Sequence, residues 1–330
     1  MTTIRELETI TPEVFDQKAT HPLQLFAWGV IRQKTGLRVV RFGEYDGETL
    51  KAVYQMTLHK VPLISFWIGY IPRSQMPSDF FLEYLRKYSK RYRIVSVLFE
   101  PDVVHGEAQA SPALRRSPIP LFYEWTRTID TTQSLEAIKK ECDATTRYNI
   151  GLAERKGVEV AVEDSDAGFE AFYELYDATT KRQHFGGHGK TYHQTIWNIF
   201  KERGLAHMIV ARYRGQPLAA CEVWLHNKTL YYTYAGSSTE HRNLKAMNAL
   251  MWKVIGFAKE HGATKLDLWG ILPPETYDKH NPWAGFTDFK KGFGGQMVRM
   301  IGSYDLVCNQ PLYWLYVVFQ TLRKRFRMYL

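Results

Sequence analysis

The sequence is poor in cysteine and has no long apolar run. Its three cysteines, Cys142, Cys221 and Cys308, are odd in number and far apart. They therefore predict neither a disulfide framework nor a metal site of the CxxC type. No stretch approaches the roughly 18 apolar residues of a membrane-spanning helix, and the charged start MTTIRELETI is unlike a secretory signal. We therefore expect a cytoplasmic protein.

The signatures of common hydrolases and metalloenzymes are also missing. The chain has no HExxH motif, Walker loop or paired zinc ligands, and GFGG at residues 292–295 is too short for a dinucleotide loop. His184 and His188 have the spacing of helical ligands, but Gly186 and Gly187 between them would break a helix. We expect no metal and no cofactor.

Length and charge indicate the number of domains and the kind of partner. At 330 residues, and about 150 residues per domain, the chain should form two domains. The formal charge of +9 favours a polyanion such as nucleic acid, anionic lipid or a nucleotide-linked precursor. The charge does not choose among these, and a generally basic surface without such a partner would have the same charge.

A similar order of elements occurs in both halves of the chain. In the first half, alternating residues flank the turn-like Asp46-Gly47, and a helix capped by Ser78 leads to a strand ending at Glu100. In the second half, strands over residues 206–236 precede an amphipathic helix and the strand TKLDLWG. The repeated order predicts two structurally related domains.

The domain borders follow from the segments that join and close these halves. Residues 135–155 predict a helix that is interrupted or strained around Gly151, and we place the border inside it. The first domain then spans residues 1–142 and the second 143–302. An amphipathic C-terminal helix, residues 303–330, with a basic end, completes the first domain. The alternative is that this helix contacts a membrane surface.

The segment HNPWAGFTDFKKGFGG carries the most concentrated signal. Its glycines allow close backbone approach, and its aromatic rings supply rigid walls around Lys290 and Lys291. A cation held among rings and glycines is suited to bind an anion, although two solvated lysines in a turn would have the same sequence. The glycines are Gly285, Gly292, Gly294 and Gly295, and the rings are Trp283, Phe286, Phe289 and Phe293.

Six segments, in order along the chain, resemble the FemABX peptidyltransferases. They are HPLQLFAWG, YIPRS, TTRYNIGLAERKGV, YAGSS, LDLWG and FKKGFGG. The resemblance implies an α/β (α+β) fold of two tandem acetyltransferase-like (GNAT) domains, with the C-terminal helix returning to the first domain. No sustained heptad interrupts the second domain, so the chain resembles the compact type without a coiled-coil arm.

The same resemblance implies the partners and the reaction. Family members transfer an amino acid from aminoacyl-tRNA to an amine of a lipid-linked or UDP-linked muropeptide. Apart from the resemblance, we expect a cytoplasmic monomer, and contact of the basic C-terminal helix with the cytoplasmic face of the membrane stays the alternative to its packing on the first domain. The amino acid, the acceptor amine and the carrier of the muropeptide stay open.

The family pattern also assigns the catalytic residues. The lysine that follows the phenylalanine of FKKGFGG is Lys290, and a fixed ammonium there would stabilise the oxyanion of an aminoacyl ester under attack. The acidic residue at the end of the first domain's last strand is Glu100, beside Asp102, which would orient the attacking amine. Proton removal falls to Glu100 or to a substrate phosphate. The family's YIPRG is YIPRS here, so Ser74 replaces a glycine.

The resemblance assigns substrate-binding residues less directly than it assigns the catalytic residues. Lys34 and Arg182 are candidates for phosphate contacts, and Tyr234 for a hydrogen bond to sugar or phosphate. Phe289 and Trp269, in FKKGFGG and LDLWG, complete the set. Lys34 and Arg182 could equally be ordinary surface cations, and the Tyr234 hydroxyl could be satisfied inside the domain.

Two other functions compete with aminoacyl transfer. An acetyl-CoA-dependent N-acyltransferase of the same fold would need a glycine-rich loop before the helix at Arg242, where the sequence is HRNLKAMNAL. A non-catalytic module that binds tRNA or membrane would have no use for the glycines and rings around Lys290.

Overall fold

The chain forms two compact units. The computed structural model describes residues 1–62, 64–183 and 186–327. Unit 1 comprises Met1–Glu124 and Arg299–Leu330, and unit 2 comprises Trp125–Val298. The border expected at residue 142 lies inside unit 2. Of the two spaced histidines, His184 is outside the described residues.

Unit 1 is built on a seven-stranded sheet with the order β1-β2-β3-β4-β5-β14-β6. Strands β4 and β5 are parallel, joined by α3, and the pairs β1–β2, β2–β3, β3–β4, β5–β14 and β14–β6 are antiparallel. The elements are β1 (Thr2–Glu6), α1 (Pro12–Asp16), the short helix η1 (Pro22–Gln24), α2 (Phe26–Lys34), β2 (Arg38–Asp46), β3 (Thr49–Lys60), β4 (Trp67–Pro72), α3 (Asp79–Tyr92), β5 (Ile94–Glu100), β6 (Arg115–Arg116), β14 (Tyr304–Val307) and α10 (Gln310–Arg327).

Helix α3 encloses the main core of unit 1. Ser78 caps the helix by accepting a hydrogen bond from the Phe81 amide, as the sequence predicts. Phe81 and Leu85 then pack with Phe42 and Phe99 of the sheet, all fully buried. Burying such a side chain contributes roughly 1.5–3 kcal/mol, so this face anchors β5 and the Glu100 at its end.

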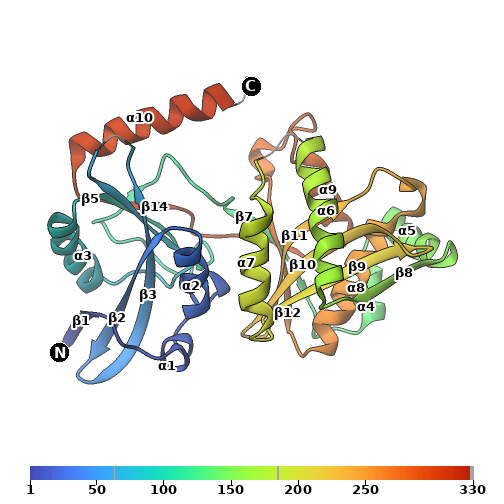
Figure 1. Cartoon of the computed structure of the whole chain (residues 1–330), viewed down its shortest axis with the longest axis horizontal. Helices are drawn as coiled ribbons and strands as arrows, with labels where there is room; N and C mark the ends of the chain where they lie inside the picture. Colours follow the sequence, from blue (N-terminus) through green and yellow to red (C-terminus); the bar gives the residue numbers. More distant parts are fainter. Residues whose placement is uncertain (63, 184–185, 328–330) are drawn as a thin grey trace. The chain divides into compact units, whose positions relative to one another are not determined.

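The C-terminal segment returns to unit 1, as expected, but not wholly as a helix. Residues 304–307 form β14, which pairs with β5, and α10 begins only after Asn309, whose side chain accepts from the Leu312 amide. Buried Tyr313 of α10 packs in a cluster with Ile68 and Val95, and Figure 1 shows α10 lying beside β5. Within the described part of the chain, no helix combines the length and apolarity needed to cross a membrane.

Unit 2 is built on a second seven-stranded sheet with the order β13-β7-β12-β11-β10-β9-β8. Strands β11 and β12 are parallel, joined by α8. The elements are β7 (Trp125–Asp130), α4 (Leu135–Glu141), α5 (Ala144–Arg155), β8 (Val158–Val162), α6 (Asp166–Gln183), α7 (Lys190–Lys201), β9 (Ala206–Tyr213), β10 (Gln216–His226), β11 (Thr229–Ser237), the short helix η2 (Arg242–Leu244), α8 (Ala246–Glu260), β12 (Lys265–Ile271), the short helix η3 (Pro274–Thr276), α9 (Ala284–Gly292) and β13 (Gln296–Arg299).

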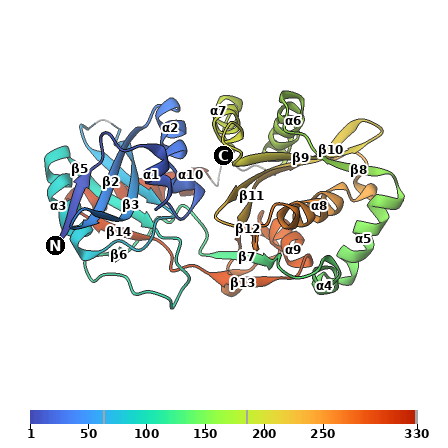
Figure 2. The same ribbon diagram turned by 90° about the horizontal axis from the view of Figure 1, so that it is seen from below.

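Helices cover both faces of the second sheet. Figure 2 shows α6 and α7 on one face and α8 with α5 on the other. The glycine of YAGSS allows α6 to approach β11 closely, because a Cβ on Gly236 would lie 2.2 Å from the Leu175 carbonyl carbon. That motif therefore has a packing reason in addition to its place near the site described below.

The two units share one topology, which confirms the prediction from the repeated order. An antiparallel meander, β2-β3-β4 or β9-β10-β11, leads through α3 or α8 to a parallel strand, β5 or β12. An antiparallel strand, β14 or β7, then pairs with that strand on its other side.

The helix expected over residues 135–155 is interrupted elsewhere than predicted. It divides into α4 and α5 at Cys142 and Asp143, while Gly151 lies inside α5. The break occurs there because the Asp143 carboxylate accepts from the Thr146 amide and starts a new helix.

Candidate active site

Lys290 is held at the end of β12 by the helix that carries FKKG. Two side chains of α9 contact the end of this strand and the residue after it: Lys290 Nζ donates to the Gly270 carbonyl at 2.8 Å, and Thr287 Oγ1 accepts from the Leu272 amide at 3.1 Å. Lys290 is only 8% exposed. Burial lowers its pKa to about 8, partly offset by the nearby Asp267 carboxylate.

Trp269, next to the Lys290 contact, has a strained backbone. Its φ of 65° lies in the left-handed region, which a bulky residue rarely adopts. Asp267 Oδ1 accepts from the Trp269 amide at 2.7 Å and from Thr126 Oγ1 at 2.5 Å, and Thr126 Oγ1 also contacts the Trp269 carbonyl oxygen at 2.9 Å. These contacts fix the strained turn that presents the Gly270 carbonyl to Lys290. Such strain is typical of functional sites.

Tyr234 lies where β11 and β12 separate. The two strands pair only between Thr229–Tyr231 and Lys265–Asp267, so Tyr234 is beyond their last paired residues. Its ring packs edge-on against His193, with centroids 4.7 Å apart. Burial raises the pKa of Tyr234 well above its usual range, so its hydroxyl stays protonated and able to donate.

The groups behind Tyr234 are buried and uncharged at neutral pH. Burial lowers the pKa of His193 to about 3 and raises that of Glu222 to about 8. Glu222 Oε1 accepts from Trp224 Nε1 at 2.8 Å. Within the described residues, Glu222 Oε2 and both ring nitrogens of His193 have no hydrogen-bond partner. These buried groups therefore add no charge around Tyr234.

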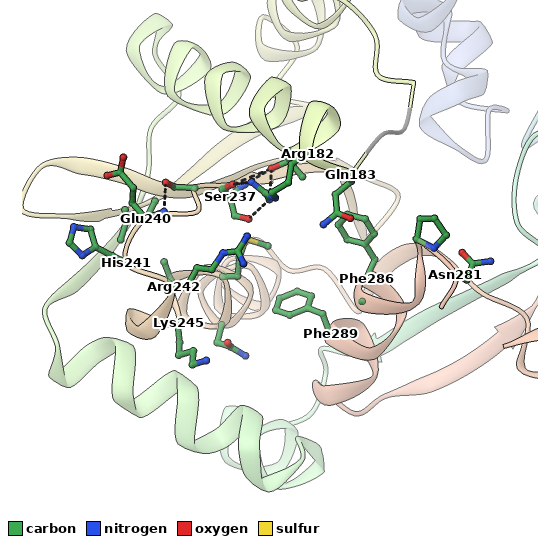
Figure 3. Close-up of a pocket in the computed structure, with 18 residues that line it drawn as sticks. Arg182, Gln183, Ser237, Glu240, His241, Arg242, Lys245, Asn281, Phe286 and Phe289 are labelled. Atoms are coloured by element: carbon green, nitrogen blue, oxygen red, sulfur yellow. Dashed lines mark hydrogen bonds between the residues drawn. The ribbon is translucent and has the colours of Figure 1, made fainter. Parts of the chain in front are cut away.

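A cavity of about 590 Å³ lies between the end of α6, the start of α8 and α9 (Figure 3). Phe286 and Phe289 line it from α9. Arg182, Arg242 and Lys245 bring three cations against one carboxylate, that of Glu240. The amino-terminal end of α8 adds backbone amides and the positive end of the helix dipole. The volume lies within the roughly 300–1,000 Å³ of small-molecule sites, and the charge suits an anionic ligand.

Arg182 belongs to the wall of this cavity and is already engaged. Its guanidinium donates to the Ser237 carbonyl at 3.1 Å and lies 3.4 Å from Ser237 Oγ. Burial, and secondarily the charge of Arg242, lowers its pKa. Arg242 and Lys245 are exposed, so they are the freer phosphate ligands. From the sequence alone, these two residues were not selected as phosphate ligands. The signal that could have found them is the concentration of basic side chains in HRNLK, residues 241–245.

The glycines of FKKGFGG approach the protein's own backbone. Gly294 and Gly295 have positive φ, and a Cβ on Gly295 would lie 2.3 Å from the Thr128 carbonyl oxygen. Phe293 is fully buried in the core of unit 2, with Phe289 packed edge-on beside it. This turn therefore fixes α9, buries Lys290 and leaves Lys291 exposed.

Glu100 in unit 1 is a buried carboxylate that accepts four hydrogen bonds. Its Oε1 accepts from the Leu121 and Phe122 amides and from Ser303 Oγ, at 2.7, 3.0 and 2.7 Å. Its Oε2 accepts from the Tyr70 hydroxyl at 2.6 Å. With 2% of its surface exposed, Glu100 is placed to anchor these segments, and Oε2 keeps one unused acceptor position.

The remaining unit 1 candidates lie in α2 and in the YIPRS turn. Lys34 is exposed in the last turn of α2. The left-handed residue of the turn is Arg73, with φ 46°, so Ser74 at the glycine position is tolerated. Arg32 and Arg73 both lie close enough to Tyr70 to lower its pKa, against the larger effects of burial and Glu100. Sequence reasoning missed these two cations, because only the fold brings them to one place.

Across the described residues, no group of three or more His, Cys, Asp or Glu side chains is arranged to hold a metal ion.

Comparisons with known proteins agree with this fold. Residues 141–288 match the family described as acetyltransferase (GNAT) domain. The lipid II:glycine glycyltransferase of Staphylococcus epidermidis (strain ATCC 35984) is 21% identical, covering 90% of this chain and 91% of its own. The crystal structure of FemX covers 95% of this chain and all of its own, with TM-score 0.85 and 18% identity. A tandem GNAT protein from the clavulanic acid pathway covers 92% and 98%, with TM-score 0.55 and 9% identity.

The fold and the matched relatives define an acyltransferase of tandem GNAT architecture. Relatives named lipid II:glycine glycyltransferase and FemA, together with the structural match to FemX, support the FemABX family that the six motifs indicate.

Proposed function

We propose that this protein transfers an amino acid from aminoacyl-tRNA to an amine of a peptidoglycan precursor. The observation that carries the proposal is the buried ammonium of Lys290, fixed by Gly270 in a unit whose cavity is lined by cations. The family membership supports it, because a relative that matches along most of this chain is named for glycyl transfer to lipid II.

The chemistry requires one amide bond to form and one ester bond to break. The acceptor amine attacks the ester carbonyl carbon, and negative charge develops on the carbonyl oxygen. Lys290 donates one N–H to Gly270 and can direct another at that oxygen, in a site with little water. When the intermediate collapses, the ribose oxygen leaves with the electron pair and takes a proton. We assign the amine proton to the leaving ribose oxygen or to a substrate phosphate, because Glu100 is buried and already accepts four hydrogen bonds.

The cavity of unit 2 is assigned to the donor. The 3′ end of a tRNA carries phosphates next to a flat base. Arg242, Lys245 and the α8 amides suit the phosphates, and Phe286 and Phe289 suit stacking of the base. An acetyl-CoA donor fits less well, because the turn before α8 has no glycine and places His241 and Lys245 at its left-handed positions.

Unit 1 is assigned to the acceptor. Lys34, Arg32 and Arg73 supply cations for a diphosphate, whether that diphosphate links the muropeptide to lipid or to uridine.

The proposed aminoacyl transfer is tested by labelling the amino acid of a charged tRNA pool. Release of label from tRNA should depend on added precursor. Release that is the same without precursor would contradict the proposal.

We expect turnover to fall as pH rises through about 8. Burial lowers the pKa of Lys290 to about 8, so the ammonium form is dominant below that pH and is lost above it. The profile of kcat against pH should therefore have a descending limb near 8, after correction for spontaneous ester hydrolysis. An arginine stays charged over this range, so the residual activity of Lys290→Ala and Lys290→Arg should lack that limb. A limb that persists in both variants would assign it to another group.

We expect the double variant Arg242→Ala/Lys245→Ala to raise the KM for aminoacyl-tRNA about tenfold and to change kcat little, because phosphate contacts are made equally in ground and transition states. The dependence of KM on salt should also become shallower, because fewer counterions are released on binding. Lys156→Ala/Arg203→Ala removes two exposed cations of unit 2 outside the cavity and is the matched control. If the control raises the KM for aminoacyl-tRNA equally, the cavity is not the site that binds the donor.

A further inference from the structure

Helix α10 has two apolar faces, and only one of them is covered. Tyr313 and Val317 pack on unit 1 in a cluster with Ile68, Val95 and Ile119. The other face is exposed to solvent along the helix that Figure 1 shows beside β5. Its large side chains and their exposed fractions are Trp314 46%, Leu315 66%, Val318 56%, Phe319 51% and Leu322 48%.

These five side chains, which we call the α10 stripe, form one continuous surface. Their spacing of one, three, one and three residues places them on the same side of an α-helix. No charged residue occurs between residues 310 and 322. The outer face of a helix packed on a soluble domain is normally polar, so an apolar stripe of this length indicates a partner.

The charges around the stripe indicate what that partner is. The helix continues from the stripe into the sequence RKRFR, which starts at the exposed Arg323. At its other end, the Arg115 guanidinium lies 5.2 Å from the centre of the Trp314 ring. A tryptophan and large aliphatic side chains beside cations are the features by which helices lie in the interface of an anionic membrane.

We propose that the α10 stripe inserts into the headgroup region of an anionic bilayer and holds unit 1 against it. A second copy of this chain is disfavoured as the partner, because each copy carries a formal charge of +9. The role of this membrane contact rests on the proposed function, because an enzyme held at the membrane meets a lipid-linked acceptor where that acceptor resides. The membrane contact itself does not depend on the reaction.

The test is sedimentation with vesicles of phosphatidylglycerol and phosphatidylethanolamine, and separately with vesicles of phosphatidylcholine alone. The intact protein should bind the anionic vesicles at least tenfold more tightly than the neutral ones. Compared with the intact protein, Leu315→Glu/Phe319→Glu should bind the anionic vesicles about tenfold or more weakly. Both apolar side chains are lost from the interface, and the new negative charges repel the anionic lipid. Circular dichroism and thermal unfolding should be unchanged, because these side chains are exposed.

Phe80→Glu is the matched control, since Phe80 is 60% exposed on α3 of the same unit. Its binding should equal that of the intact protein. Undiminished vesicle binding by the α10 variant would overturn the proposal. So would an absence of binding together with a dimer that the α10 variant dissociates in analytical ultracentrifugation.

An activity measurement separates this inference from the proposed function. With lipid-linked precursor in vesicles, the α10 variant should transfer at least about tenfold more slowly, and with the same precursor in detergent micelles it should match the intact protein. If no preparation transfers any amino acid while vesicle binding still requires the stripe, the proposed function fails and the membrane contact stands.

Discussion

Lys290→Ala should lower the turnover of aminoacyl transfer on the order of a hundredfold while the affinity for the precursor stays nearly unchanged. The oxyanion that Lys290 contacts exists only along the reaction path, so its loss raises the barrier without weakening the ground-state complex. The burial of Lys290 strengthens this expectation, because a charge in a site with little water interacts more strongly with a developing anion. Turnover is measured at saturating concentrations of both substrates, and precursor affinity by calorimetry.

Two further variants make the Lys290 prediction specific. Lys290→Arg should restore little activity, because a planar guanidinium cannot fit where a compact ammonium contacts the Gly270 carbonyl at 2.8 Å. Lys291→Ala should have a small effect, because Lys291 is exposed on the next residue of the same helix. If Lys291 is the sensitive position, or if Lys290→Ala loses precursor affinity, the assignment is wrong.

Glu100→Ala should lower the free energy of unfolding by about 3 kcal/mol, because it leaves several buried donors without their charged acceptor. Those donors are the Leu121 and Phe122 amides, Ser303 Oγ and the Tyr70 hydroxyl. The measurement is urea unfolding, read by circular dichroism. Because unit 1 would lose the contacts that fix residues 121–122 to the end of β5, activity should fall together with stability.

Glu100→Gln distinguishes an anchoring role from a catalytic one. The amide oxygen can keep the contacts of Oε1, and the amide nitrogen can donate to the Tyr70 oxygen, so we expect a loss of about 1 kcal/mol in stability. Turnover should then stay within about tenfold of the intact enzyme, since a positioning residue needs the contacts and not the charge. A folded Glu100→Gln enzyme with turnover lowered a hundredfold or more would make Glu100 the general base.

The architecture was predictable because its signals are local and occur twice. The Asp46-Gly47 turn, the Ser78 cap and the hairpin, helix and strand order of each half are visible in short stretches of sequence. Two boundaries were not located. Strand β14 depends on tertiary pairing with β5 and β6, some 200 residues earlier in the chain. The helix over residues 135–155 breaks where Asp143 caps α5, a local signal that the prediction overlooked.

The candidate site was predictable in its motif but not in its geometry. The family pattern singled out Lys290, and its neighbours Phe289 and Phe293 pack in the core of unit 2. The strained Trp269 could not be predicted, because its left-handed backbone is imposed by the Asp267 and Thr126 contacts. The exposed stripe on α10 was also hidden, because a sequence that is apolar on two faces does not tell which face is covered.

The most direct test offers the enzyme two donors at once. Lipid-linked precursor is incubated with a charged tRNA pool and acetyl-CoA together, and the product is weighed by mass spectrometry. We predict that the precursor gains the mass of an amino acid residue, and that Lys290→Ala forms this product on the order of a hundredfold more slowly. A product that gains an acetyl group instead, or the aminoacyl product formed at the same rate by Lys290→Ala, would contradict the account.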